Sequence, residues 1–232
     1  MRERPSNPVK PAVRKTTLAV DVVVLSPQAE TLAVLLVRAA AVGRERWSLP
    51  WDAPMSGEGL EDAASRITES ALGTAPALLE QVGAFADARR HPGDADVSIA
   101  VVALTPHVET ALLGGAEWFS LAALPPLSPR HRAIVDRAIS VIRQRVDQSP
   151  LAFRLLPATF TLSDLQAIYE LLLGRRLHKA SFRRALQASY LVEPTDEWRS
   201  EGRGRPAQLF RYAPRKRRGS RRGVRFDLFT DN

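Results

Sequence analysis

Apolar side chains follow two different periods along the first two thirds of the chain. Residues 17–26, 31–38 and 97–104 are short runs of mostly β-branched or aliphatic residues, which is typical of buried strands. Residues 59–72 and 129–146 repeat apolar side chains every three or four positions, which is the period of one helix face. Strands mixed with helices predict an α/β or α+β domain.

Two stretches lack either period. Trp47, Pro50 and Trp51 interrupt residues 38–59, so that stretch is expected to be a loop. Residues 147–157 are expected to be a linker between this domain and the last third of the chain.

The last third of the chain predicts two helices joined by a tight turn. Thr161 and Asp164 have the spacing of an N-terminal capping pair, and Gly174 is a natural C-terminal stop. Residues 179–189 predict a second helix with Phe182 facing inward. Two helices with a short turn between them have the outline of a helix-turn-helix.

Two short strands and a loop follow these helices. Residues 190–194 and 207–214 are expected to pair, and residues 195–206 are expected to form a flexible basic loop between them. Helices followed by a basic hairpin have the order of a winged helix-turn-helix, so the chain is predicted to be α+β with a winged helix at its C-terminal end.

The distribution of charged residues along the chain adds a prediction of function to this prediction of the fold. Residues 1–150 hold 16 basic and 17 acidic side chains, whereas residues 151–232 hold 17 basic and 8 acidic ones. A basic excess confined to one domain is the footprint of a surface that binds a polyanion. The alternative is a solvated basic tail. Residues 1–15 are expected to be a flexible basic tail and residues 214–232 a disordered basic tail that adds nonspecific affinity for nucleic acid.

Composition excludes several classes of protein. The chain has no cysteine, so it has no disulfide, no thiolate metal site and no cysteine nucleophile. No apolar run is long enough to span a membrane, and the basic N-terminus is not followed by the apolar segment of a signal peptide. A cytoplasmic protein is therefore expected.

Candidate DNA contacts come from the second helix and the wing. The N-terminal residues of the second helix of a helix-turn-helix lie near base edges, and wing arginines meet phosphates or a narrow minor groove. The residues expected to contact DNA are Lys179, Ser181, Arg183, Arg184, Arg199, Arg203 and Arg205. The alternative is that these side chains form a solvated surface.

Residues 52–73 resemble the Nudix box, whose pattern is G-x5-E-x7-R-E-U-x-E-E-x-G-U, where U is aliphatic. Glu58, Arg66 and Gly73 match this pattern, while Asp52 stands at the first glycine. The family's site uses three carboxylates to hold a divalent cation beside a diphosphate. Their positions are occupied here by Ile67, Ser70 and Ala71. The resemblance therefore implies a Nudix-like fold with no metal site, no catalytic residues and no efficient hydrolysis.

A Nudix-like domain followed by a winged helix is similar to the Nudix-related transcriptional regulator family, NrtR. The run FTL-x-DLQ-x-IYE-x-LLG at 160–174 and the Gly-Arg-Pro at 204–206 carry much of this resemblance. It implies an α/β/α sandwich with a mixed sheet at 16–148 and a winged helix at 149–213. It also implies a homodimer that binds a palindromic operator in double-stranded DNA and represses genes of NAD metabolism. The implied effector is ADP-ribose or a related NAD-derived nucleotide, with no cofactor required.

Six residues are candidates for contact with such an effector. Family members often carry an R-D-P-R-G-R-like stretch before the central strand, and here that stretch reads ADARRHPGDADVS, so the register stays open. Paired arginines suit a diphosphate because each guanidinium donates two parallel hydrogen bonds. The candidates are Arg38, Trp47, Glu58, Arg66, Arg89 and Arg90. The alternatives are a surface role for the Arg pair, a core role for Trp47 and a loop-to-helix brace for Glu58 and Arg66.

Two rival functions stay open. One is a Nudix hydrolase of ADP-ribose or another nucleoside diphosphate derivative with an accessory nucleic-acid-binding domain. The other is a nonspecific nucleic-acid or RNA-binding adaptor whose affinity comes from the basic tail. The missing carboxylates argue against the first, and binding that survives raised salt would argue against the second.

Overall fold

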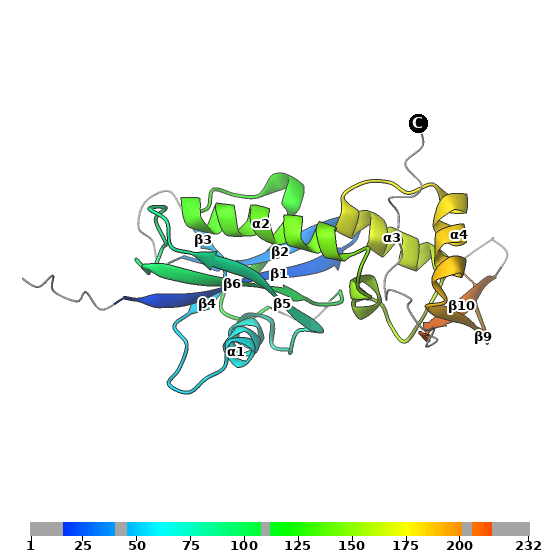
Figure 1. The fold of residues 1–232 in the computed structure, drawn as a ribbon, viewed down its shortest axis with the longest axis horizontal. Helices are drawn as coiled ribbons and strands as arrows, with labels where there is room; N and C mark the ends of the chain where they lie inside the picture. Colours follow the sequence, from blue (N-terminus) through cyan, green and yellow to red (C-terminus); the bar gives the residue numbers. More distant parts are fainter. Residues whose placement is uncertain (1–15, 40–45, 108–111, 201–205, 215–232) are drawn as a thin grey trace, which may run out of the picture.

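The structure is a computed structural model that describes residues 16–39, 46–107, 112–200 and 206–214. Figure 1 shows a layered α/β part followed at one end by a smaller part built from two helices and a hairpin. The tails predicted at 1–15 and 214–232 lie outside the described residues, except for residue 214 itself.

A seven-stranded mixed sheet forms the centre of the first part (Figure 1). Its main path is β3-β2-β1-β6-β5, while β4 also pairs with β1 and β7 with β2. β1 and β6 run parallel, and the other pairs are antiparallel. The strands are β1 (Leu18–Gln28), β2 (Thr31–Arg38), β3 (Trp47–Ser48), β4 (Trp51–Asp52), β5 (Leu78–Phe85), β6 (Val97–Leu104) and β7 (Glu117–Ser120).

One helix covers each face of this sheet. α1 (Leu60–Leu72) lies on one face and α2 (Pro129–Arg145) on the other (Figure 1). Successive strand side chains point to opposite faces, so Val22 of β1 packs in the cluster with α1 whereas Val23 packs in the cluster with α2. The predicted α/β/α sandwich with a mixed sheet is confirmed.

The second part is the predicted winged helix. α3 (Leu162–Leu173) begins at the capping box of Thr161 and Asp164, in which both reciprocal hydrogen bonds are present. α4 (Lys179–Ser189) follows after a short turn. A three-stranded sheet of order β8-β10-β9 completes it. Its strands are β8 (Thr159–Phe160), β9 (Val192–Arg199) and β10 (Ala207–Tyr212).

The segment expected to be a linker is instead part of the core. A short 3₁₀ helix, η2 (Leu151–Leu155), buries Leu151, Phe153 and Leu155. One hydrophobic cluster runs from the sheet through α2 and η2 into α3 and α4. The linker prediction was wrong because no secondary-structure period marks so short a helix, although its side chains are apolar.

Three further differences separate the sequence prediction from the fold. β9 extends to Arg199 and pairs Trp198 with Gln208, so the first part of the expected flexible loop is strand. Residues 38–59 contain β3 and β4, two-residue strands too short to produce a period. β5 was not predicted, because Glu80, Gln81 and Gly83 interrupt its apolar residues; in the sheet its pairing with β6 has a register shift next to Gly83. Among the described residues, no helix has both the length and the apolar character needed to cross a bilayer.

Candidate functional site

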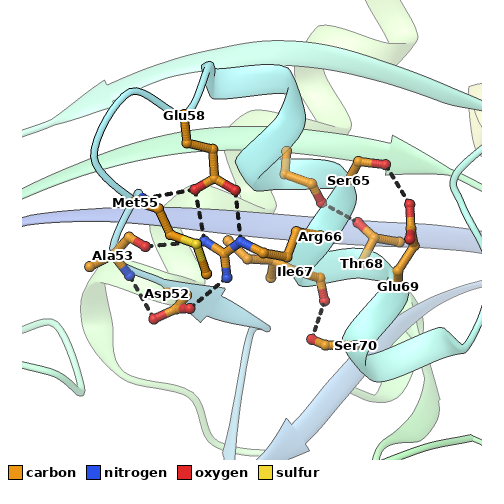
Figure 2. A network of polar contacts seen from close by, with 11 residues as sticks. Asp52, Ala53, Met55, Glu58, Ser65, Arg66, Ile67, Thr68, Glu69 and Ser70 are labelled. Carbon is orange, nitrogen blue, oxygen red and sulfur yellow. Dashed lines mark hydrogen bonds and ion pairs between the residues drawn. The ribbon is translucent and has the colours of Figure 1, made fainter.

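Arg66, in the middle of α1, is held by the loop that precedes its helix (Figure 2). Its Nε and Nη2 donate to the two carboxylate oxygens of Glu58 at 2.7 and 3.0 Å, and its Nη1 donates to Asp52 at 2.7 Å. Nη2 also donates to the carbonyl of Ala53 at 3.2 Å, and Glu58 accepts from the amide of Met55 at 2.8 Å. The Glu58–Arg66 pair is therefore a brace between loop and helix, with little of the guanidinium left for a phosphate.

Charge pairing sets the ionisation of this brace. The hydrogen bonds from Arg66 lower the pKa of Glu58 to about 2, and those to Glu58 and Asp52 raise the pKa of Arg66 above its usual value. Both groups are charged across the physiological pH range, so the brace holds at neutral pH.

A cavity of about 240 Å³, here called the box cavity, lies where the Nudix pattern would place its metal. Ile67 and Ala71 line it but are 3% and 4% exposed and belong to the core under α1. The Ser70 hydroxyl donates to the carbonyl of Ile67 at 2.8 Å. Among the described residues that line the cavity, the only carboxylate is that of Asp52, which pairs with Arg66. Mg²⁺ needs several oxygen ligands, and the described residues of this wall offer one carboxylate, which is already paired with Arg66.

Arg89 and Arg90 lie in the loop between β5 and β6 and line a second cavity of about 590 Å³, here called the loop cavity. Their side chains are 54% and 55% exposed and pair with Asp87 and Asp94 of the same loop. The hydrogen bond from the backbone amide of Arg89 is the main cause that lowers the pKa of Asp87. Exposed pairs of this kind are weak, so the two guanidinium groups are only loosely held by their carboxylate partners.

Arg130, which was not among the predicted site residues, forms hydrogen bonds with the backbone of the same loop. It is only 3% exposed and donates to the backbone carbonyls of Asp87 and Ala95 at 2.6 Å and of Asp96 at 3.3 Å. Arg130 is the second residue of α2, and from the sequence an arginine at this position is expected to be exposed. The buried guanidinium therefore fixes the two ends of the loop that carries Arg89 and Arg90.

A buried carboxylate on β1 joins the loop to α2. Oδ1 of Asp21 lies 3.0 Å from Nε2 of His91 and 2.8 Å from Nε2 of His131, and all three side chains are fully buried. Burial alone would raise the pKa of Asp21, but the hydrogen bonds from His131 and His91 bring it well below its usual value. The carboxylate is therefore ionised in the folded protein.

The hydrogen bonds on the far side of each ring fix its tautomer. Nδ1 of His131 accepts from the amide of Leu49 at 3.1 Å, and Nδ1 of His91 accepts from the amide of Gly93 at 3.0 Å. Each Nε2 therefore carries the proton that it donates to Asp21. The three ligand atoms lie within 4.8 Å of one another, but a metal-bound histidine normally donates from its second nitrogen. In this arrangement the cluster is a hydrogen-bonded anchor that joins β1, the loop and α2.

Trp51 separates the two cavities. It lines the box cavity, and its ring meets the ring of His91, which lines the loop cavity, edge to face at 4.7 Å. Gly93 lies against the same indole, where a Cβ would come within 2.1 Å of the ring. The two cavities are therefore neighbours with a shared aromatic wall.

Arg38 and Trp47 form a third, separate group at the edge of the sheet. The Arg38 guanidinium lies 4.8 Å from the centre of the Trp47 ring and pairs with Glu117 at 3.2 Å. The same indole packs edge to face on Phe119 at 4.8 Å. Contacts on both sides favour the core role of Trp47 over stacking on an adenine. Among the described residues, no hydrogen bond or ion pair joins this group to Arg66 or Arg89.

The second helix of the pair presents most of the predicted DNA contacts. Lys179, Arg183 and Arg184 are exposed on α4, while Ser181 is half-buried with its hydroxyl 3.4 Å from Nδ1 of His178. Phe182 is buried, as predicted. Gln187 is also exposed on this helix, but it is not among the predicted DNA contacts because it carries no charge.

Arg199 lies at the end of β9 and not in a flexible loop. Its Nη2 donates to both carboxylate oxygens of Asp164 at 2.8 Å, which ties the wing to the capping box of α3. Burial raises the pKa of Asp164, but the hydrogen bond from Arg199 and those from Thr161 leave it below its usual value. Arg199 therefore braces the wing. Arg203 and Arg205 lie outside the described residues.

Two family models match the chain. Residues 15–138 match the NUDIX domain, and residues 152–212 match the NrtR DNA-binding winged helix domain. The matches cover the layered part and the winged helix respectively.

Individual relatives share this architecture. A curated protein of Acinetobacter baylyi, the ADPR responsive transcriptional repressor NtrR, is 31% identical over 211 residues, which are 84% of this chain and 82% of that protein. The crystal structure of Shewanella oneidensis NrtR complexed with a 27mer DNA is 27% identical, has a TM-score of 0.73 and aligns over 85% of this chain and 94% of that one. A MutT/nudix family protein of Enterococcus faecalis, at 20% identity and a TM-score of 0.67, shares the fold over 91% and 90% of the two chains.

Proposed function

We infer, from the premise that this chain belongs to the NrtR family, that it is a transcriptional repressor whose Nudix domain senses ADP-ribose. The observation that carries this function is a Nudix fold joined by one continuous core to a winged helix with an exposed basic second helix. The curated relative is itself an ADPR-responsive repressor. Because ADP-ribose derives from NAD, we propose that the repressed genes serve NAD metabolism.

The DNA-binding surface that we propose centres on α4. Lys179, Arg183 and Arg184 are exposed there, and the Shewanella relative was crystallised with duplex DNA. In a helix-turn-helix the second helix enters the major groove, while surrounding cations contact phosphates. Ser181 lies near the start of the helix, and Arg199 acts indirectly by holding the wing. Arg203 and Arg205 remain proposed wing contacts.

The effector site that we propose spans the box cavity and the loop cavity. ADP-ribose is elongated, with a diphosphate between two sugars, and the two cavities adjoin across Trp51 and His91. Arg89 and Arg90 are the cations best placed to take the diphosphate, since their present carboxylate partners are exposed. Arg66 and Glu58 shape the box cavity, and Arg38 with Trp47 lies beyond it.

We propose that the protein does not hydrolyse its effector efficiently. The three positions that hold metal in the Nudix pattern carry Ile67, Ser70 and Ala71, and two of them are closed into the core. Incubation with ADP-ribose and Mg²⁺ tests this proposal. Turnover that disappears in Glu58→Gln would overturn it and would favour the rival hydrolase.

A repressor of this type is proposed to act as a homodimer. The two-fold symmetry of a dimer matches a palindromic operator, with half-sites separated by whole turns of about 10 bp. We also propose that it works in the cytoplasm, where bacterial operators are found. Light scattering on the free protein and on its complex with operator DNA measures the number of chains.

One titration tests the function as a whole. The full chain is mixed with the upstream region of an NAD-biosynthesis operon and followed by gel shift while ADP-ribose, NAD or nicotinamide nucleotides are added. We expect specific retention at raised salt that ADP-ribose changes and an unrelated nucleotide does not. Retention that needs residues 215–232 and vanishes with salt would instead identify the nonspecific adaptor.

A further inference from the structure

Helix α4 has a buried face and an outward face. Phe182, Ala185 and Leu186 are buried against the rest of the winged helix. The exposed residues recur three or four positions apart, which places them on one side of the helix. They are Lys179, Ala180, Arg183, Arg184, Gln187 and Ala188. The outward face therefore carries four long polar side chains together with two alanines, whose small size permits close approach to a groove.

Three of the long polar side chains on this face lie beyond the first turn of α4 and have no partner among the described residues. Within the part of the chain that the structure describes, Arg183, Arg184 and Gln187 make no side-chain hydrogen bond or ion pair. The amide of Gln166, on the neighbouring helix, instead donates to Glu170 and to the carbonyl of Leu177 at 2.9 Å. The amide group of Gln187 is thus free for an external partner.

Arg183 and Gln187 emerge on the same side of α4. Both line a hollow of about 340 Å³ between this helix and β9. They are four residues apart, so their positions along the helix axis differ by about 6 Å at 1.5 Å per residue. Stacked base pairs follow one another every 3.4 Å or so. The two side chains therefore reach base pairs that are adjacent or about two steps apart.

We propose that Gln187 reads an adenine in each operator half-site and that Arg183 reads a guanine within about two base pairs of it. A glutamine amide pairs with N6 and N7 of adenine, and an arginine pairs with O6 and N7 of guanine. Gln187 is uncharged and adds nothing to the electrostatic attraction for phosphates, so we assign its amide to the choice of base. This inference rests on the proposed function, in which α4 lies in the major groove, and it names the sequence content of the DNA partner.

Selection from a randomised DNA library tests the assignment. The full-length wild type, Gln187→Ala, Gln187→Glu and the matched control Gln144→Ala, an exposed glutamine on α2, each select duplexes at the same salt. We expect Gln187→Ala to lose a preference of about tenfold or more for adenine at one position per half-site. Gln187→Glu is expected to move that preference to cytosine, because a carboxylate only accepts and cytosine N4 donates. The control is expected to select the wild-type sequence.

A second measurement changes the DNA and compares the wild type with Gln187→Ala. Replacing the assigned adenine by 7-deazaadenine removes N7, and the wild type is expected to bind this duplex several-fold more weakly, whereas Gln187→Ala is expected to bind both duplexes equally. If the wild type selects a palindrome and Gln187→Ala selects the same bases, or if both proteins ignore 7-deazaadenine, the assignment of Gln187 is wrong and the proposed function stands. If the wild type selects no palindrome, the proposed function itself fails.

Discussion

Individual buried polar residues decide how the candidate effector site is held together. Asp21, His91 and His131 come from a strand, a loop and a helix, and no spacing in the sequence connects them. The Glu58–Arg66 pair could be predicted, because both residues belong to one box, and its alternative role as a brace agrees with the geometry. Sequence patterns indicate periods within one element, whereas the three residues of the Asp21 anchor come together only when the sheet, the loop and α2 have packed.

Removing the Asp21 carboxylate leaves two buried N–H donors without an acceptor. Each such donor costs about 1–3 kcal/mol, so Asp21→Ala is expected to lower the free energy of unfolding by about 2–6 kcal/mol. Asp21→Asn keeps an acceptor oxygen and should lose less. Urea denaturation measures both, with Asp136→Ala as a control, because the Arg132–Asp136 pair is exposed and contributes at most about 1 kcal/mol. Equal losses for Asp21→Ala and the control would contradict the anchor.

The brace at Glu58 predicts a pH dependence with a definite sign. Its pKa falls from 4.5 when unpaired to about 2 in the folded protein, so unfolding at acid pH takes up a proton. The contribution of the brace is complete above pH 4.5 and is lost as pH falls toward 2. Between these values the free energy of unfolding of Glu58→Gln should fall less steeply than that of the wild type. Urea titrations at several pH values measure the slopes, and parallel slopes would rule out a folded-state shift at Glu58.

Whole elements could be predicted where their own residues carry the signal. The aliphatic run of β6 and the capping box of α3 are local, and both elements formed as expected. The full length of β9 could not be predicted, since Asp196 and Glu197 are polar and lie at a register shift between the pairs Phe210–Pro194 and Gln208–Trp198. For η2 the burial comes from neighbours in space, which a period in the sequence does not record.

The loop between β5 and β6 depends on α2 through a single side chain. Arg130 supplies donors to carbonyls at both ends of this loop, so Arg130→Ala should raise hydrogen exchange in residues 86–96 and weaken ADP-ribose binding. Arg132→Ala, two residues along α2 and exposed, is the matched control. DNA binding without effector should be unchanged in both. Unaltered exchange in Arg130→Ala would show that the loop holds its shape without this residue.

One hydrophobic core joins the Nudix domain to the winged helix, so the two are expected to unfold cooperatively. Phe153 of η2 contacts the rings of Phe160 and Tyr212 at 5.8 and 4.5 Å, in the cluster that also contains the α2 face of the sheet. Phe153→Ala should therefore lower the free energy of unfolding by about 3 kcal/mol and expose both parts of the chain together. Calorimetry should show one transition, with hydrogen exchange rising in β6 and α3 alike. Two separate transitions would mean that the Nudix domain and the winged helix are independent units, and an effector signal would then need a route other than this shared core.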